Sequence, residues 1–233
     1  MINVVLIPDG NRRGAKKLGL RLAEVYRLAA KKVDMAMQFF LSQEDVDVFV
    51  VYGLSFDNIK KRSVDKLKPI YEVQEEQYKK WIKDAFLSKH KVKVKVAGEW
   101  KNLQRTESFP SGLPDSYLDA VRELEEVTSK NEGKLFFILI GYSGRKEITK
   151  SFEKIVSSGV KIANPHLLNV LEVPHEIDIV IRTAGERRLS DVLPYQSAYA
   201  ELSFIDKDFP EIEEYDLKSV LEDFKKRKRN FGR

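Results

Sequence analysis

The sequence predicts an α/β fold, in which a central, mostly parallel sheet of six strands is flanked by helices. Short apolar runs alternate along the chain with longer stretches whose apolar residues recur at helical spacing. Most of the runs are continuously hydrophobic, as strands buried on both faces of a parallel sheet are. No stretch has the composition of a linker and no segment is repeated, so we expect a single domain over residues 1–233.

The first part of the chain predicts two strands and two helices. Residues 2–7 form an apolar run, and a Pro-Asp-Gly-Asn turn separates this strand from residues 15–41, where apolar side chains recur every three or four positions. Residues 46–52 (VDVFVVY) predict the second strand. A polar loop at 53–63 then leads into an amphipathic helix over about residues 69–87.

The middle of the chain repeats the pattern. Residues 92–97 (VKVKVA) alternate strictly and predict a third strand, and a loop rich in Gly, Pro and Ser runs from there to residue 114. Residues 115–129 predict a helix, residues 135–140 a fourth strand, and residues 144–157 a further helix.

The last part predicts two strands, at residues 177–183 and 202–205, and a closing helix at residues 217–229. In open α/β sheets, ligands bind beyond the carboxyl ends of the strands. The segments that follow residues 7, 52, 140 and 183 are therefore where we expect the functional site.

Composition excludes several classes of site. The chain has no Cys, which excludes disulfides, thiolate catalysis and Cys-based zinc sites, and only three His, none in a metal-binding spacing. Lys and Arg number 41 against 36 Asp and Glu, and much of the excess lies in residues 225–229. A solvated basic helix end explains that run best, with an electrostatic site for phosphate, nucleic acid or an anionic membrane as the alternative.

The chain is expected to be cytoplasmic. Its first residues lack the basic region of a signal peptide, and no apolar stretch approaches the length of a membrane span. We expect at most peripheral membrane contact. Nucleic-acid binding is supported only by the basic balance and by no recognition motif, so we expect no nucleic-acid partner.

The turn after the first strand has the features of an anion site. Gly10 permits close approach of the backbone, and a helix that starts there would point its N–H groups at a ligand. Arg12 and Arg13 add positive charge, with Arg21 two turns further on. Asp9 at the rim suits Mg²⁺, which prefers one or two carboxylates together with phosphate oxygens. The alternative is that Asp9 only caps a helix.

A second cationic segment follows the fifth strand. Arg182, Arg187, Arg188 and Ser190 surround an Ala-Gly turn and indicate a second oxyanion site. Glu201 lies in an otherwise apolar stretch, where a carboxylate is either ion-paired or a metal ligand. Two anion sites on one sheet edge, beside long amphipathic helices, indicate a diphosphate substrate with an apolar tail. The usual nucleotide loops, GxxxxGK[ST] and GxGxxG, are absent.

These segments carry a family resemblance. Asp9, Gly10 and Asn11, with Arg13 and Ala15, resemble the first signature of the cis-prenyltransferases, the undecaprenyl diphosphate synthase family. Residues 52–58 are similar to that family's Tyr-x-Phe-Ser-x-Glu-Asn segment, residues 142–145 match a further family element, and residues 182–201 are similar to its C-terminal signature. The matches follow in order along the whole chain, and the Asp-rich DDxxD motifs of the trans-type synthases are absent.

The resemblance implies a hydrophobic tunnel beside the sheet, a dimer, and a Mg²⁺-dependent transferase that condenses an allylic prenyl diphosphate with isopentenyl diphosphate. It implies that Asp9 and Glu201 hold Mg²⁺. It implies that the catalytic residues are Asp9, Asn11, Ser55 and Asn58. It assigns substrate binding to Gly10, Asn11, Arg12 and Arg13 on the allylic side, to Arg182, Arg188 and Ser190 on the isopentenyl side, and further to Arg21, Ser55, Asp57, Lys61 and Leu189.

Several positions depart from the family pattern. Gly14 replaces an aromatic residue, Lys61 an Arg and Asp57 a Glu, and residues 230–232 (NFG) replace the Arg-x-Gly that completes a neighbouring subunit's site. These departures predict relaxed acceptor choice, extending to allylic diphosphates or alcohols. Bulky residues at Leu139 and Ile140 predict short products. The alternative is that the chain is one subunit of a heteromeric cis-prenyltransferase and needs a partner, although it keeps the diphosphate motifs that such partners lose.

Overall fold

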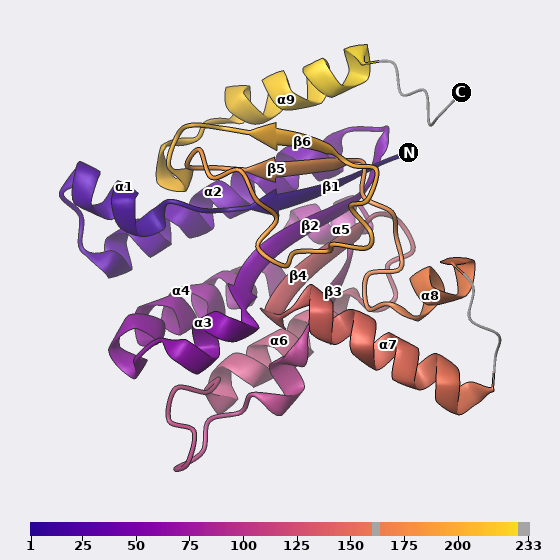
Figure 1. Ribbon diagram of the computed structural model, residues 1–233. Helices are drawn as coiled ribbons and strands as arrows, with labels where there is room; N and C mark the ends of the chain where they lie inside the picture. The colour runs from indigo at the N-terminus through magenta and orange to yellow at the C-terminus, as the bar shows by residue number, and fades with distance from the viewer. Residues whose placement is uncertain (160–163, 228–233) are drawn as a thin grey trace.

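The computed structural model describes residues 1–159 and 164–227, and its centre is one sheet of six parallel strands (Figure 1). The strand order is β3-β4-β2-β1-β5-β6. The bounds are β1 Ile2–Ile7, β2 Val46–Ser55, β3 Lys93–Ala97, β4 Leu135–Tyr142, β5 Ile179–Arg182 and β6 Glu201–Phe204. The predicted fold class is confirmed, and every strand pair in the described chain is parallel.

The helices mostly match the predicted segments. Their bounds are α1 Asn11–Leu18, α2 Leu22–Ser42, α3 Phe56–Lys61, α4 Val64–Ile82, α5 Ala85–Lys89, α6 Asp115–Thr128, α7 Gly144–Ser158, α8 Asn164–Val170 and α9 Glu214–Lys226, with 3₁₀ turns at Glu99–Asn102 and Phe209–Glu211. Helix α8 was not expected. The predicted end of the last helix at residues 228–229, and the NFG segment at 230–232, lie outside the described residues.

Two differences from the predicted elements shape the site. The helix expected at 15–41 is divided into α1 and α2, because Gly19 adopts a left-handed conformation (φ 65°) that ends α1. The loop expected at 53–63 is instead the end of β2 followed by α3. Ser55 starts that helix, since its side chain accepts a hydrogen bond from the Asn58 N–H at 2.9 Å.

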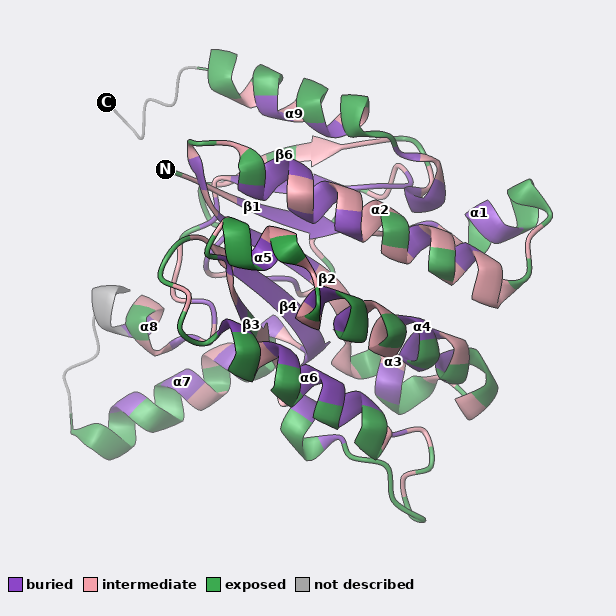
Figure 2. Cartoon of the chain, turned by 180° about the vertical axis from the view of Figure 1, so that it is seen from behind, coloured by how far each residue is buried: buried purple, intermediate pink, exposed green. Residues whose placement is uncertain are grey.

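The two faces of the sheet are covered differently. Helices α2, α4, α5, α6 and α9 cover one face (Figure 2), where they bury a large aliphatic and aromatic core that includes Phe40, Phe49 and Phe136. The other face is covered by α7 and by the mostly irregular segment between α8 and β6, which buries Val173, Val192 and other residues against the strands (Figure 1). Among the described helices, none combines the length and the apolar composition that crossing a membrane requires.

The topology brings the ends of β1 and β5 together. The chain leaves β1 toward β2 on one side and leaves β5 toward β6 on the other, so the strand order reverses between these two neighbours. Such a switch point leaves a crevice at the carboxyl ends of the strands, where ligands bind in open parallel sheets. The two cationic segments singled out in the sequence both begin there.

Candidate active site

A cavity of about 1160 Å³ opens at the carboxyl edge of the sheet. Its mouth is charged: seven cationic and four anionic side chains of the described residues line it, which favours an anionic ligand. Its inner part lies between β2, β4, α2 and α4 and is mainly apolar. The residues there include Ala29, Val33, Val51, Ile70, Val73, Ile138 and Trp81. The cavity thus has the division expected for a ligand with a polyanionic head and an apolar tail, and its inner part is the predicted tunnel.

Asp9 and Arg182 join the two strand ends at the mouth. Arg182 Nη2 donates to Asp9 Oδ2 at 2.7 Å, and Arg182 Nη1 donates to Ser190 Oγ at 2.7 Å and to the Arg188 carbonyl. The Thr183 hydroxyl donates to the Asp9 carbonyl at 2.7 Å and lies 2.8 Å from the Asp9 N–H. The Arg182 side chain is 4% exposed, whereas that of Asp9 is 38% exposed. One arginine therefore fixes both the carboxylate and the loop after β5.

These contacts keep Asp9 ionised. Burial by itself would raise the pKa of Asp9, but the hydrogen bonds from Arg182 and from the Gly10 N–H, with the charges of Arg182 and Arg13, outweigh it and hold the pKa below its ordinary value of 3.8. Asp9 therefore presents a partly exposed carboxylate to the cavity at neutral pH.

Helix α1 starts directly beside Asp9. Gly10 is its N-cap, at φ 96°, and no acidic side chain lies in its first turn, so the positive end of the helix dipole lies at the mouth, with Asp9 as the carboxylate that accepts from the Gly10 N–H. Asn11 lines the cavity, and its side-chain oxygen is buried without a hydrogen-bond partner in the described chain. The predicted anion site after the first strand is thus assembled.

We expect Gly10→Ala to lower the free energy of unfolding by about 2 kcal/mol. An added Cβ would meet a strained positive φ and would lie 2.3 Å from Asp208 Oδ1 and 2.8 Å from the Ala184 Cβ. Gly19→Ala is the matched control, because Gly19 has φ 65° and nothing within 4 Å of an added Cβ, so we expect only about 1 kcal/mol there. Urea denaturation of both variants tests this, and equal losses would contradict it.

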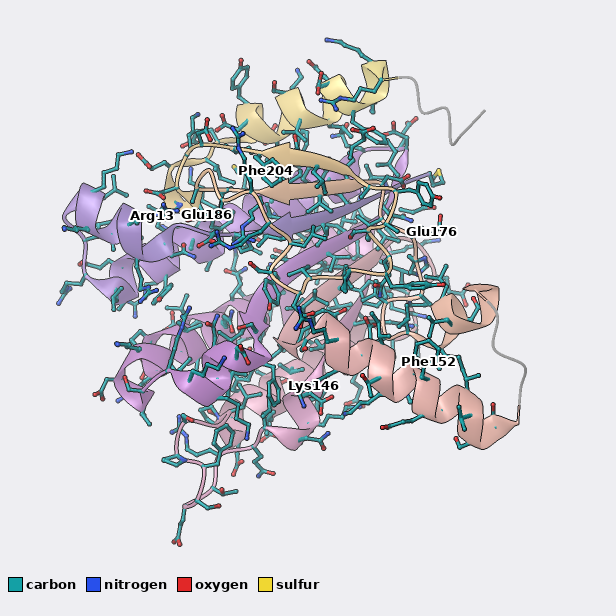
Figure 3. The ribbon with its side chains drawn as sticks, in the orientation of Figure 1. Arg13, Lys146, Phe152, Glu176, Glu186 and Phe204 are labelled. Atoms are coloured by element: carbon teal, nitrogen blue, oxygen red, sulfur yellow. The ribbon has the colours of Figure 1, made fainter. Side chains whose placement is uncertain are left out.

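Glu186 connects the two cationic segments. Its carboxylate lies 3.3 Å from Arg13 Nη2 and also pairs with Arg188, so this residue of the loop after β5 connects that loop to α1 (Figure 3). Arg13 further donates to the Ala184 carbonyl at 2.9 Å and lies 3.5 Å from Asp208. Arg13 is therefore largely neutralised by the protein, and an incoming anion would compete with Glu186 for Arg13 and Arg188.

Ser55 and Asn58 lie at the mouth on the opposite side from Arg182. Tyr52 bonds to the Ser55 side chain, and burial, partly offset by that bond, raises the pKa of Tyr52 to about 12, so it remains a neutral phenol. Tyr52, Ser55, Asp57 and Asn58 all line the cavity. The third predicted segment is therefore part of the same site.

Of the residues predicted to be catalytic or to bind substrate or metal, eleven line the cavity: Asp9, Gly10, Asn11, Arg12, Arg13, Ser55, Asp57, Asn58, Arg182, Arg188 and Ser190. Four do not. Arg21 is 85% exposed and pairs with Glu24, because the break at Gly19 carries it away from the mouth. Lys61 is exposed and pairs with Asp57 at 2.6 Å. Leu189 packs into the core on the face that α7 covers.

The largest correction concerns Glu201. It is the first residue of β6, whereas Arg182 is the last residue of β5, and the two strands are paired in parallel. Glu201 therefore lies at the opposite edge of the sheet from Asp9, where it pairs with Arg227 at 2.9 Å. Within one copy of the chain, Asp9 and Glu201 cannot hold the same cation. The ion-paired alternative for Glu201 is the one observed.

The described residues contain no cluster of three or more His, Cys, Asp or Glu that could by itself hold a metal. Asp9 nevertheless suits Mg²⁺ that is held mainly by a bound diphosphate, because that ion commonly takes one or two carboxylates and completes its shell with phosphate oxygens and water. Asp9 presents a partly exposed carboxylate at the anion site.

Sequence reasoning missed several polar residues that line the cavity, among them Arg62 and Tyr26. Arg62 is half-buried, and no carboxylate of the described chain forms an ion pair with it. Burial lowers its pKa, as does the nearby charge of Arg12, while Tyr26 and Asp9 raise it. The helical spacing of Tyr26 with Ala29 and Val33 could have identified Tyr26. Arg62 carried no such signal, because its segment was expected to be loop.

Comparisons with known proteins agree with this geometry. The Prenyltransf family model, whose description names undecaprenyl diphosphate synthase, matches residues 7–232. The chain is 32% identical to a tritrans,polycis-undecaprenyl-diphosphate synthase (geranylgeranyl-diphosphate specific) of Pyrobaculum aerophilum, over 99% of this chain and 95% of that protein. It is 34% identical to the protein of the same name from Pyrococcus horikoshii, over 99% and 86%.

Solved structures show the same fold. The structure of lavandulyl diphosphate synthase from Lavandula x intermedia, in complex with dimethylallyl diphosphate, superposes with a TM-score of 0.85 at 25% identity, covering 99% of this chain and 98% of that one. A Campylobacter jejuni structure, titled as a probable undecaprenyl diphosphate synthase, superposes with a TM-score of 0.80 at 20% identity, covering 100% and 99%.

Proposed function

The chain belongs to the undecaprenyl diphosphate synthase family of cis-prenyltransferases, and we propose that it condenses an allylic prenyl diphosphate with isopentenyl diphosphate. The observation that carries the proposal is a single cavity with two cationic segments at its mouth and an apolar interior. A diphosphate head and a prenyl tail fit those two parts.

The allylic diphosphate is assigned to the start of α1. There the helix N–H groups, Arg12 and the half-buried Arg62 can stabilise the negative charge that develops on the diphosphate as its C–O bond breaks. Arg188 and Ser190 are assigned to isopentenyl diphosphate, whose double bond must be held against the allylic carbon, and Arg182 positions this loop through its bonds to Ser190 and to the Arg188 carbonyl. After the new bond forms, the acceptor loses a proton, which the departing diphosphate can take as a base. Ser55 and Asn58, which line the mouth, can orient the acceptor for that transfer.

We propose that Asp9 holds Mg²⁺ together with the bound diphosphate. Such an ion would supply further charge neutralisation on the leaving group. Arg182, through its bond at 2.7 Å, keeps the Asp9 carboxylate ionised and oriented toward the cavity.

The donor is proposed to be geranylgeranyl diphosphate, which the names of the sequence relatives specify. The prediction of short products rested on Leu139 and Ile140, and neither lines the cavity, since Ile138 is the residue of β4 that does. The prediction of relaxed acceptor choice rested partly on Gly14, which packs against Pro210 away from the cavity. We therefore propose isopentenyl diphosphate as the acceptor.

Incubation of the purified chain with Mg²⁺, isopentenyl diphosphate and allylic diphosphates of increasing length tests this function. Mass spectrometry should find products extended by whole isoprene units, with geranylgeranyl diphosphate the best donor. Products formed from two allylic diphosphates, or with an alcohol as acceptor, would instead support the prediction of relaxed acceptor choice. If the chain alone consumes no donor, the heteromeric alternative replaces the proposal.

Arg62→Ala is expected to weaken donor binding by about 2 kcal/mol, or roughly 30-fold in donor KM, because a charge-assisted contact is lost. Lys61→Ala removes one positive charge from the adjacent residue, but that side chain is exposed and paired with Asp57. We expect Lys61→Ala to leave the donor KM within about twofold. Steady-state kinetics with either substrate varied would decide, and the reverse ranking would show that Lys61 is the ligand.

We also propose that two copies of the chain form a dimer. Exposed apolar side chains near the edge strand β6, among them Tyr199 and Leu202, support this, because exposed apolar residues at a sheet edge are commonly covered by a partner. Light scattering at micromolar concentration should give twice the mass of the chain. A fully active monomer would contradict the dimer.

A further inference from the structure

The apolar part of the cavity runs up to a packed aromatic core, and from this we infer its closed end. The lining residues that adjoin this core are Val33 on α2, Val51 on β2, Ile138 on β4 and Trp81 on α4. Val51 and Ile138 are register partners in the sheet, and the next pair facing the same way, Phe49 and Phe136, is fully buried core. Because α4 ends at Ile82, Trp81 lies on the last turn of its helix.

Trp81 is backed by packed aromatic rings. Its ring lies edge-on to Phe136, with centroids 5.3 Å apart, and Phe136 stacks on Phe49, which stacks on Phe40, at 5.6 and 5.3 Å. A close-packed core of this kind has no room for an additional side chain or for the end of a ligand. An apolar chain that grows inward from the mouth would therefore stop at the indole of Trp81.

A buried carboxylate outside the cavity determines where that indole lies. Asp34 on α2 is 8% exposed, is absent from the cavity lining, and accepts a hydrogen bond from Trp81 Nε1 at 2.7 Å. Lys80 Nζ donates to its other oxygen at 2.6 Å. An indole N–H that loses its acceptor in this apolar interior would be left unsatisfied, so Asp34 strongly favours one ring orientation.

We propose that Asp34 is a positioning residue for product length, because its hydrogen bond holds Trp81 across the closed end of the cavity. The inference rests on the proposed function for its effect on products, but the contact between Asp34 and Trp81 can be tested without turnover. If Asp34 only linked α2 to α4, its removal would lower the stability of the protein without changing the length at which the growing prenyl chain stops.

Tryptophan fluorescence tests the contact. The chain has two Trp, at positions 81 and 100, so Trp100→Phe leaves Trp81 as the reporter. In that background we expect Asp34→Leu to raise acrylamide quenching several-fold and Asp34→Asn, which keeps an oxygen acceptor, to restore most of the protection. Lys80→Ala is the control, because it removes the other strong partner of Asp34 and leaves the indole bond. If Asp34→Leu does not fold, Asp34→Ala in the same Trp100→Phe background takes its place. Acrylamide quenching of Trp81 that is unchanged in the folded variant would overturn the proposal.

A double-mutant cycle tests the effect on products, with geranylgeranyl diphosphate and isopentenyl diphosphate as substrates. Asp34→Leu and Trp81→Phe should each broaden the product distribution toward longer chains. The double variant should match Trp81→Phe alone, since Asp34 acts through the indole N–H. Independent, additive lengthening would overturn the proposal. If the wild-type chain makes no product, the proposed function and the product-length role of Asp34 fail together. The quenching experiment still tests the contact between Asp34 and Trp81.

Discussion

Asp9→Asn is expected to lower turnover by about 10³-fold, with little change in the fold. The substitution keeps the size of the side chain and one of its two oxygen acceptors, so the bond from Arg182 or the bond from the Gly10 N–H can persist, but not both. It also removes the charge that would hold Mg²⁺ against the diphosphate. Single-turnover kinetics with saturating Mg²⁺ and donor would measure it. Addition of EDTA to the wild-type chain should cause a loss of similar size.

Asp57→Asn is the matched control for Asp9. Asp57 also lines the cavity, but it is exposed and paired with Lys61, so we expect turnover within a few-fold of wild type. Near wild-type turnover in Asp9→Asn would contradict the metal-binding role of Asp9.

Because the folded pKa of Asp9 is below its ordinary value of 3.8, its contribution to stability is present above that pH and is lost as the pH falls through the folded pKa.

Arg182→Ala is expected to affect stability and activity together. It removes the hydrogen bonds to Asp9 and Ser190 and leaves Asp9 without its closest countercharge. We expect a loss of about 2 kcal/mol in the free energy of unfolding, less than is usual for breaking a fully buried pair because Asp9 is partly exposed. Turnover should fall at least as far as in Asp9→Asn, since Asp9 and the loop after β5 both lose their position.

Arg188→Ala separates binding from positioning. Its side chain is exposed, so we expect almost no loss of stability, and the effect should appear as a higher KM for isopentenyl diphosphate. Thermal denaturation and steady-state kinetics of the two variants would measure the split. If Arg182→Ala were as stable as Arg188→Ala and differed from wild type only in KM, the positioning role assigned to Arg182 would be wrong.

The sequence by itself determined the fold class and most of the mouth of the cavity. Apolar runs marked the strands, and the turn at Asp9 and the segment at Arg182 directly follow two of them. Because the ends of parallel strands meet at one sheet edge, these segments had to lie close together. Local chemistry was sufficient here, since each residue's position relative to its own strand end could be read from the chain.

The tertiary structure decided which of the predicted residues do not line the cavity of one copy of the chain. Glu201 was assigned to the metal by the family resemblance, whereas the structure makes it the first residue of β6 and so places it, within one copy of the chain, at the far edge of the sheet from Asp9. Arg21 and Lys61 point to other partners because of the break at Gly19 and the start of α3 at Ser55. A helix break or a helix start inside a predicted segment is not visible in a periodic pattern, but it changes the side of the element on which the following side chains lie.

The closed end of the cavity could not be predicted from the sequence either. Trp81 was expected only as an apolar position of a helix, and Asp34 appeared in an amphipathic stretch with nothing to distinguish it from a surface carboxylate. The two residues lie 47 positions apart and meet only because α2 and α4 pack together on one face of the sheet. Contacts of this kind depend on packing between helices distant in sequence, whereas periodicity describes only which face of each helix is buried.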